Sequence, residues 1–178
     1  MPSPWRSTGW RTTARGPTAS PSGLYATVGV PTTALGTADG AAPTWDDLVD
    51  AVGRLRDANE EPGAQILADR TARVLAKQRE AGTTGPYLAP PTYLDGVKRL
   101  PTGQVSVTQT EGTATDASDI FTGDFSKLLI GLRAGLQISV LKERYADTRQ
   151  VGLVAHYRGD VGIARLKAFD VVTGVLGG

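Results

Sequence analysis

The sequence predicts an α+β fold in which two helices precede several strands. Apolar residues recur at three- and four-residue spacing between about residues 45 and 81, as in amphipathic helices. Beyond residue 105 they alternate every second residue, as in half-buried strands. The two kinds of element do not alternate along the chain, which argues against the β-α-β units of a parallel sheet.

The composition fits a globular protein and excludes several kinds of site. The 178 residues fit one domain, or one domain with an appendage. The chain has no cysteine, which excludes disulfides, thiolate zinc sites and cysteine nucleophiles. A formal net charge of +1, with no sustained basic block, disfavours a dedicated nucleic-acid binder. No apolar stretch approaches the roughly 20 residues that cross a bilayer, so we predict no membrane partner.

Residues 1–22 form an irregular segment rich in Pro, Gly, Ser, Thr and Arg, with no usable periodicity. An Arg- and Ser-rich opening without acidic residues is also typical of an organelle transit peptide, but an unstructured lead-in is the interpretation we favour. Trp5 and Trp10 are unusual in such a segment. Either they dock onto something, or this stretch is not the natural start of a folded unit.

The first strand is predicted at 24–30 and the clearest helix at 45–55. Thr44 is a good N-cap, and Asp46 and Asp47 lie in the first turn, where acidic side chains favour the helix dipole. A second helix is predicted at 69–81, with Gly82 as its stop. Both helices owe their prediction to an apolar stripe on one face.

A long loop at 82–101, punctuated by Gly and Pro, follows the helices. We interpret Tyr87, Leu88 and Tyr93 as its three anchors, and long ordered loops often serve interactions. Alternation around Val105 and Val107, over 136–140 and over 151–157 then predicts strands. The pair Gly159-Asp160 predicts a hairpin turn between the last strand and 161–163.

The chemistry-bearing residues do not form a recognisable active site. His156, the only histidine, would need Asp160 and Ser126 to complete a triad, and the sequence gives no reason for Ser126 to lie close. We therefore interpret His156 as a surface or interface residue. The acidic cluster at 46–50 fits a helix N-terminus, and the one at 60–61 fits a turn. The acidic residues in 116–124 are spaced too loosely for a calcium-binding loop. We predict no catalytic residue, no cofactor and no metal.

Several phrases, taken in order, resemble tailed-phage major capsid proteins of the Hong Kong ninety-seven type, over roughly residues 16–175. The two strongest are Gly-Asp-Phe-Ser at 123–126 and the closing series of Arg158-Gly159-Asp160 followed by Ala168-Phe169. Weaker ones are the Gly-rich segment 16–24, the amphipathic helix 45–55, the segment 64–79, Gly-Pro-Tyr-Leu at 85–88 and Leu-Asp-Gly at 94–96.

The resemblance implies a wedge-shaped axial domain at 23–145 and strands of an elongated peripheral domain at 146–178, after the irregular segment 1–22. It implies a non-enzymatic shell subunit that assembles with copies of itself and with other virion proteins. Such a subunit meets packaged DNA only non-specifically and is found in the virion, or in the host cytoplasm during assembly. Tyr87, Leu88 and Tyr93 would then lie near the tip where subunits meet, unless they only pin the loop to its own core.

In the family, an N-terminal arm, an extended loop and a long spine helix should precede residue 16. We therefore expect a truncated form: a prophage remnant, a mis-assigned start or a split protein that folds but does not close into shells alone. Some members of the family crosslink their subunits through a Lys and an Asn. We do not expect this crosslink here, because residues 145–151 contain no Asn. The alternatives are an encapsulin-type bacterial compartment, an unrelated α+β enzyme built around His156, and a binding module that uses the Pro-rich loop. Shell size, symmetry and host are not fixed by the sequence.

Overall fold

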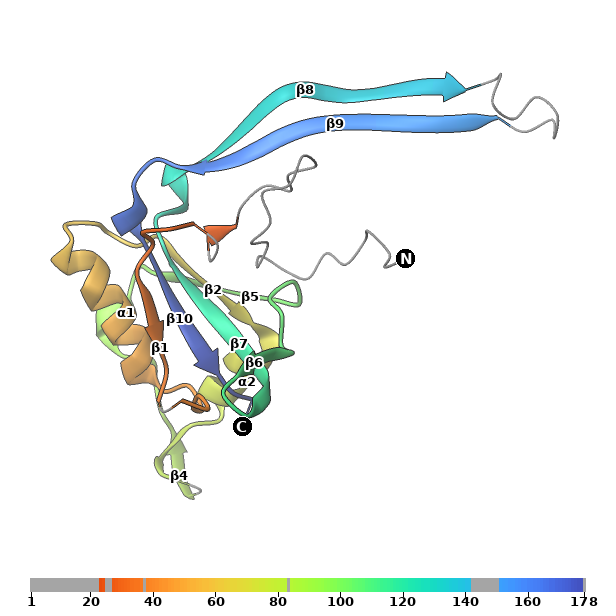
Figure 1. Cartoon of the computed structure of the whole chain (residues 1–178). Coiled ribbons are helices and arrows are strands. Elements are labelled where there is room, and N and C mark those ends of the chain that lie inside the picture. Colours follow the sequence, from red (N-terminus) through yellow and green to blue (C-terminus); the bar gives the residue numbers. More distant parts are fainter. Residues whose placement is uncertain (1–22, 25–26, 37, 83, 142–150, 178) are drawn as a thin grey trace.

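A mixed six-stranded sheet forms the body of the protein in the computed structural model, which describes residues 23–24, 27–36, 38–82, 84–141 and 151–177 (Figure 1). The strand order is β1-β10-β7-β2-β5, with β6 also paired to β7. The outer pairs β1–β10 and β2–β5 are parallel, and β7 is antiparallel to both of its central neighbours. The strands are β1 Thr32–Ala34, β2 Ala64–Ala68, β5 Lys98–Thr102, β6 Gln109–Glu111, β7 Ala114–Gly123 and β10 Phe169–Val175. With two helices, this arrangement confirms the α+β prediction.

Helix α1, Trp45–Asp57, begins where the sequence indicates. Thr44 and Asp47 form a reciprocal capping box, in which the Thr44 amide donates to the Asp47 carboxylate at 2.7 Å. Leu48 and Val52 of the apolar stripe are fully buried against one face of the sheet.

Both helices cover the same face of the sheet, because Leu75 of α2, Asp69–Ala76, joins the hydrophobic cluster of Leu48 and Ile120. Successive side chains of a strand point to opposite faces. In β7, Ile120 therefore belongs to this helix-covered face and Phe121 to the other. We call the face that bears Phe121 the second face.

Helix α2 ends at Ala76, five residues before the predicted end. Residues 79–81 form strand β3 instead, which pairs with β4, Thr84–Tyr87. Gln78 explains the change, because its side-chain amide donates to the Pro43 carbonyl at 2.7 Å and its own carbonyl accepts from the amide of Leu88. These long-range bonds replace the next helical turn. The rest of the predicted loop contains a 3₁₀ turn at Thr92–Leu94 and strand β5.

A two-stranded antiparallel ribbon extends away from the sheet (Figure 1). Its strands are β8, Leu128–Leu141, and β9, Gly152–Ile163. The 3₁₀ turns Phe125–Lys127 and Leu166–Ala168 join the ribbon to β7 and β10. Twelve residues of β9 at about 3.3 Å each give the ribbon a length of roughly 40 Å.

Three further local predictions were wrong, and two others fall on residues outside the described ones. The described residues of 24–30 form turns instead of a strand. Val105 and Val107 also lie outside any strand, and Val105 is buried in the second face. Gly159 and Asp160 are not a turn, since they pair with Leu132 and Gly131 within the ribbon. Residues 1–22 and 142–150, including the stretch considered for crosslinking, are not among the described residues.

Candidate functional site

The two strongest sequence phrases meet at the junction between the sheet and the ribbon. Strand β7 ends at Gly123, and the amide of Asp124 donates to the Ala168 carbonyl at 3.0 Å. The rings of Phe125 and Phe169 pack edge to face with centroids 5.6 Å apart. The junction thus brings together two segments that are more than 40 positions apart in the sequence.

Asp124 caps the turn that begins the ribbon. Its carboxylate accepts a hydrogen bond from the Ser126 amide at 3.0 Å. Hydrogen bonds from the side chain and the backbone of Ser126 lower the pKa of Asp124, and the Lys127 ammonium adds to the effect. The carboxylate is therefore a structural acceptor that holds the chain where it leaves the sheet.

Two ion pairs connect helix α1 and the loop that follows it to the same junction. The Arg54 guanidinium donates two hydrogen bonds to the buried carboxylate of Asp170, at 3.1 and 2.8 Å. Arg165, which lies just beyond the end of the ribbon, approaches Glu60 to 2.5 Å. Arg54 connects the helix, and Glu60 the loop after it, to segments that flank the last 3₁₀ turn. The two contacts therefore help to fix how the ribbon leaves the body.

One face of the ribbon is apolar and exposed along its length. Cross-strand pairs place large aliphatic side chains together on this face, with Tyr157 and Leu136 between them. The pairs are Ile130 with Val161, Leu132 with Gly159, Ile138 with Ala155 and Val140 with Leu153. We call these residues the apolar ribbon face.

Two register shifts in β8, between Leu132 and Gln137, keep this face continuous. One extra residue in a strand turns the following side chains to the opposite face, and a second extra residue turns them back. The other face carries Leu129, His156 and Arg158. Contiguous exposed apolar surface of this kind marks an interaction site in soluble proteins.

The sequence predicted the strands at 136–140 and 151–157, which carry much of this face, but not the exposure of its apolar side. No strand was predicted at 128–132, although Ile130 and Leu132 lie on the same face of β8 as Leu136 and Ile138. The alternation identifies a strand, but it does not reveal whether the apolar side is covered.

The three predicted interface residues are exposed and lie on two elements. Tyr87 of β4 is 59% exposed, Leu88 follows it at 37%, and Tyr93 of the Thr92–Leu94 turn is 43% exposed. Each tyrosine ring carries an arginine: Arg79 lies 4.0 Å from the centroid of Tyr87, and Arg56 lies 4.4 Å from that of Tyr93. The stacking holds both rings in place at the surface, one from the hairpin and one from α1.

The structure does not assemble the triad considered for His156. Ser126 lies at the base of the ribbon, whereas His156 is seven residues along β9 from that base, roughly 23 Å away at strand spacing. Asp160 accepts a hydrogen bond from the neighbouring Val161 amide. The acidic residues also have structural roles, since Asp47 caps α1 and Glu61 pairs with Arg56.

The described residues contain neither a cluster of metal ligands nor a membrane-spanning helix. In the part of the chain that the structure describes, no three His, Cys, Asp or Glu side chains gather as they would around a metal ion. No helix among the described residues has the length and apolar character to cross a bilayer.

The sequence model of the phage capsid family matches residues 13–174. No curated protein matches the chain. Among solved structures, a chain from Mycobacterium phage Ogopogo is 23% identical with a TM-score of 0.59, and the match covers 86% of this chain and 56% of that one.

Two further structures have the same fold. A capsid chain of the empty GTA particle is 18% identical with a TM-score of 0.62, covering 92% of this chain and 64% of that one. The SrpI encapsulin of Synechococcus elongatus is 17% identical with a TM-score of 0.57, covering 86% of this chain and 56% of that one. This chain therefore spans between 56% and 64% of the length of these three relatives.

Proposed function

This chain belongs to the phage capsid family, and we propose that it is a structural subunit of a viral capsid shell. The match of the family model to residues 13–174 is the observation that carries the proposal, because it covers the sheet, both helices and the ribbon. A shell subunit works through repeated contacts with copies of itself. The protein would be a component of the virion and would have no reaction to catalyse.

The apolar ribbon face supports a role in assembly. Large aliphatic side chains stay exposed on a strand pair only at a free-energy cost, which burial against another protein surface recovers at about 25 cal/mol per Å². The ribbon projects from the body, so it can reach a neighbouring subunit (Figure 1). We propose that the apolar ribbon face is covered in the assembled shell.

The division into an axial part, 23–145, and a peripheral part, 146–178, remains a proposal, which the strand pairing refines. Strand β10 belongs to the main sheet, whereas β8 and β9 pair only with each other among the described strands. We therefore propose that the peripheral part is the ribbon, 128–163, and that the body supplies the axial part. Tyr87, Leu88 and Tyr93 are proposed to contact neighbouring subunits from the body.

Other virion proteins are proposed as further partners, with packaged DNA met only non-specifically and assembly taking place in the host cytoplasm. The encapsulin relative shows that a bacterial compartment can have this fold, but the family model favours a viral shell.

Particles purified on a density gradient from cells that encode the chain test this function. We expect mass spectrometry to find the chain at constant stoichiometry in particles that contain nuclease-protected DNA. Particles that contain the chain together with an enclosed enzyme and no DNA would favour the compartment instead. Absence of the chain from every particulate fraction would contradict both functions.

A further inference from the structure

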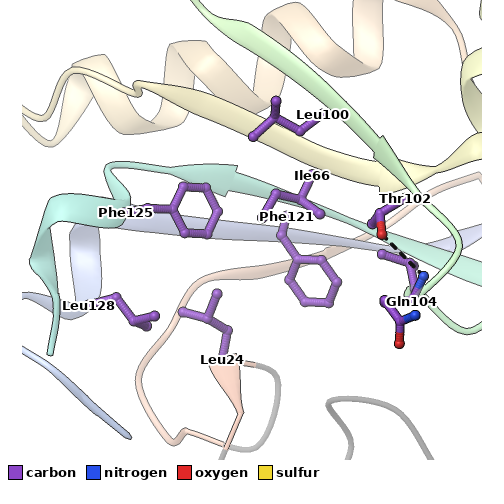
Figure 2. Close-up of a pocket in the computed structure, with 9 residues that line it drawn as sticks. Leu24, Ile66, Leu100, Thr102, Gln104, Phe121, Phe125 and Leu128 are labelled. Atoms are coloured by element: carbon purple, nitrogen blue, oxygen red, sulfur yellow. Dashed lines mark hydrogen bonds between the residues drawn. The ribbon is translucent and has the colours of Figure 1, made fainter. Parts of the chain in front are cut away.

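A cavity of about 410 Å³ lies on the second face of the sheet, the one that no helix covers among the described residues (Figure 2). Its walls are apolar and come from four separate parts of the chain, with Thr102 and Gln104 at one side. The apolar residues are Leu24, Ile66, Leu100, Val105, Phe121, Phe125 and Leu128. Cavities of roughly 300–1,000 Å³ hold ligands of drug size, so this one has room for aromatic side chains.

The chain itself leads into this cavity. Leu24 is one of its wall residues, and residue 22 is only two positions before it in the sequence. That segment contains two of the three tryptophans of the protein, Trp5 and Trp10, and the third, Trp45, is buried on the helix-covered face. Trp10 is 14 positions from Leu24, a reach of up to roughly 45 Å when extended, so both rings can fold back onto the wall.

The family relationship does not account for these two tryptophans. The family match begins at residue 13, so Trp5 and Trp10 lie outside it. In a segment otherwise rich in Pro, Ser, Thr and Arg, they are the large apolar side chains. Each indole has about 150–250 Å² of surface that burial removes from water.

We propose that residues 1–22 dock onto the second face of the sheet and that the Trp5 and Trp10 side chains fill the cavity. The occupant is part of the same chain, because a short tether gives it an effective concentration in the millimolar range, which a free partner rarely reaches. This inference does not depend on the proposed capsid function.

The absence of cysteine allows a direct test by disulfide trapping in the full chain. Thr12→Cys is combined with Gln104→Cys at the cavity, and in the control with Asp50→Cys on α1, which covers the opposite face. Gln104 and Asp50 are both exposed, so neither change disturbs packing. We expect the intramolecular disulfide to form at least about tenfold faster in the first pair than in the control.

Adding Trp5→Ala and Trp10→Ala to the first pair should reduce its rate to that of the control. Circular dichroism of each variant confirms that the sheet and helices are intact. Equal rates in the two pairs would overturn the proposal, as would a fast rate that survives loss of both tryptophans. A disulfide that forms only between chains would overturn it in favour of a second copy as the occupant.

Discussion

Gly123 occupies a position where only a hydrogen atom fits, and it explains why the two sequence phrases belong together. A Cβ on this residue would lie 2.5 Å from Phe169 Cδ1 and 2.6 Å from the Ala168 carbonyl oxygen. The close approach lets Asp124 bond to Ala168 and lets Phe125 reach the ring of Phe169. At the residue scale, the junction therefore depends on a glycine, a capping aspartate and an aromatic pair.

We expect Gly123→Ala to destabilise the protein by about 1–3 kcal/mol, the usual cost of overpacking a tight site. Gly53→Ala is the matched control, since within the described part of the chain a Cβ at this helical position would meet no atom within 4 Å. That substitution should stabilise the protein by roughly 0.5–1 kcal/mol. Urea unfolding measures both changes, and the same sign for the two would contradict the account of the junction.

The pKa of Asp124, lowered by Ser126, predicts a stability change with pH. The folded state holds the carboxylate as an anion to a lower pH than the unfolded state does. Its contribution is therefore complete above the unfolded pKa of about 3.9 and is lost as pH falls through the lower folded value. The advantage of the wild type over Asp124→Asn should shrink between about pH 5 and pH 2. Denaturant melts at several pH values measure it, and a difference independent of pH would refute this role.

Leu48 and Asp47, neighbours on α1, have unequal parts in stability. Leu48 is 1% exposed, so Leu48→Ala should cost about 2–5 kcal/mol through lost burial and a cavity. Asp47→Ala removes half of the capping box and should cost at most about 1 kcal/mol. Equal costs in denaturant melts would mean that the helix does not present its apolar stripe to the sheet.

At the scale of elements, helix α1 does more than cover the sheet. Its last turn supplies Arg54, and the loop that follows it supplies Glu60. They pair with Asp170 and Arg165, on either side of the final 3₁₀ turn. Glu60 is 8% exposed and Arg165 is 55% exposed, so the second pair lies half in solvent. Together the two pairs connect helix α1 and the loop after it to the root of the ribbon.

Arg165→Ala should destabilise the protein by about 1–3 kcal/mol, because it leaves the buried Glu60 carboxylate without its cation. Arg73→Ala is the control: Arg73 pairs with Asp69 one turn away, and both side chains are more than 60% exposed. Its cost should be at most about 0.5 kcal/mol. Urea unfolding of the two variants compares them, and equal effects would indicate that the Glu60 contact adds no stability.

The elements that the sequence predicted well are those whose signals are local. Thr44, the acidic first turn and the apolar stripe are enough to predict α1, because each signal lies within or next to the helix itself. The end of α2 was predicted too late, because Gln78 forms hydrogen bonds with Pro43 and Leu88, which no local pattern reveals. The Gly159-Asp160 turn was wrong for a similar reason: its backbone is used in pairing with β8.

The candidate site was predictable only in part. Tyr87, Leu88 and Tyr93 are exposed, and their contact with other subunits stays a prediction. The arginines stacked on the two tyrosines could not be foreseen, since Arg56 lies 37 positions from Tyr93. The sequence shows the junction only as two separate motifs, and the fold is needed to show that Gly123 and Phe169 lie in contact.

At the scale of the whole molecule, a well-packed body carries a ribbon whose apolar side has no cover among the described residues. The body buries its own core on the helix-covered face, whereas Ile130, Leu132 and Ile138 remain more than half exposed. Such an exposed apolar surface suits a shell subunit, because repeated lateral contacts need apolar surface that is free before assembly. We therefore propose that the apolar ribbon face is a contact surface within the shell.

The yield of particles formed by two variants at adjacent residues tests this proposal. Ile130 and Leu129 are 67% and 58% exposed and point to opposite faces of the same strand. When each variant replaces the natural chain in the cells that encode it, we expect Ile130→Glu to abolish sedimentable particles, because a charge would be buried at the contact. Leu129→Glu should leave the yield close to that of the natural chain, and both purified chains should fold. Particles that form normally with Ile130→Glu, or an equal loss with both variants, would contradict the claim.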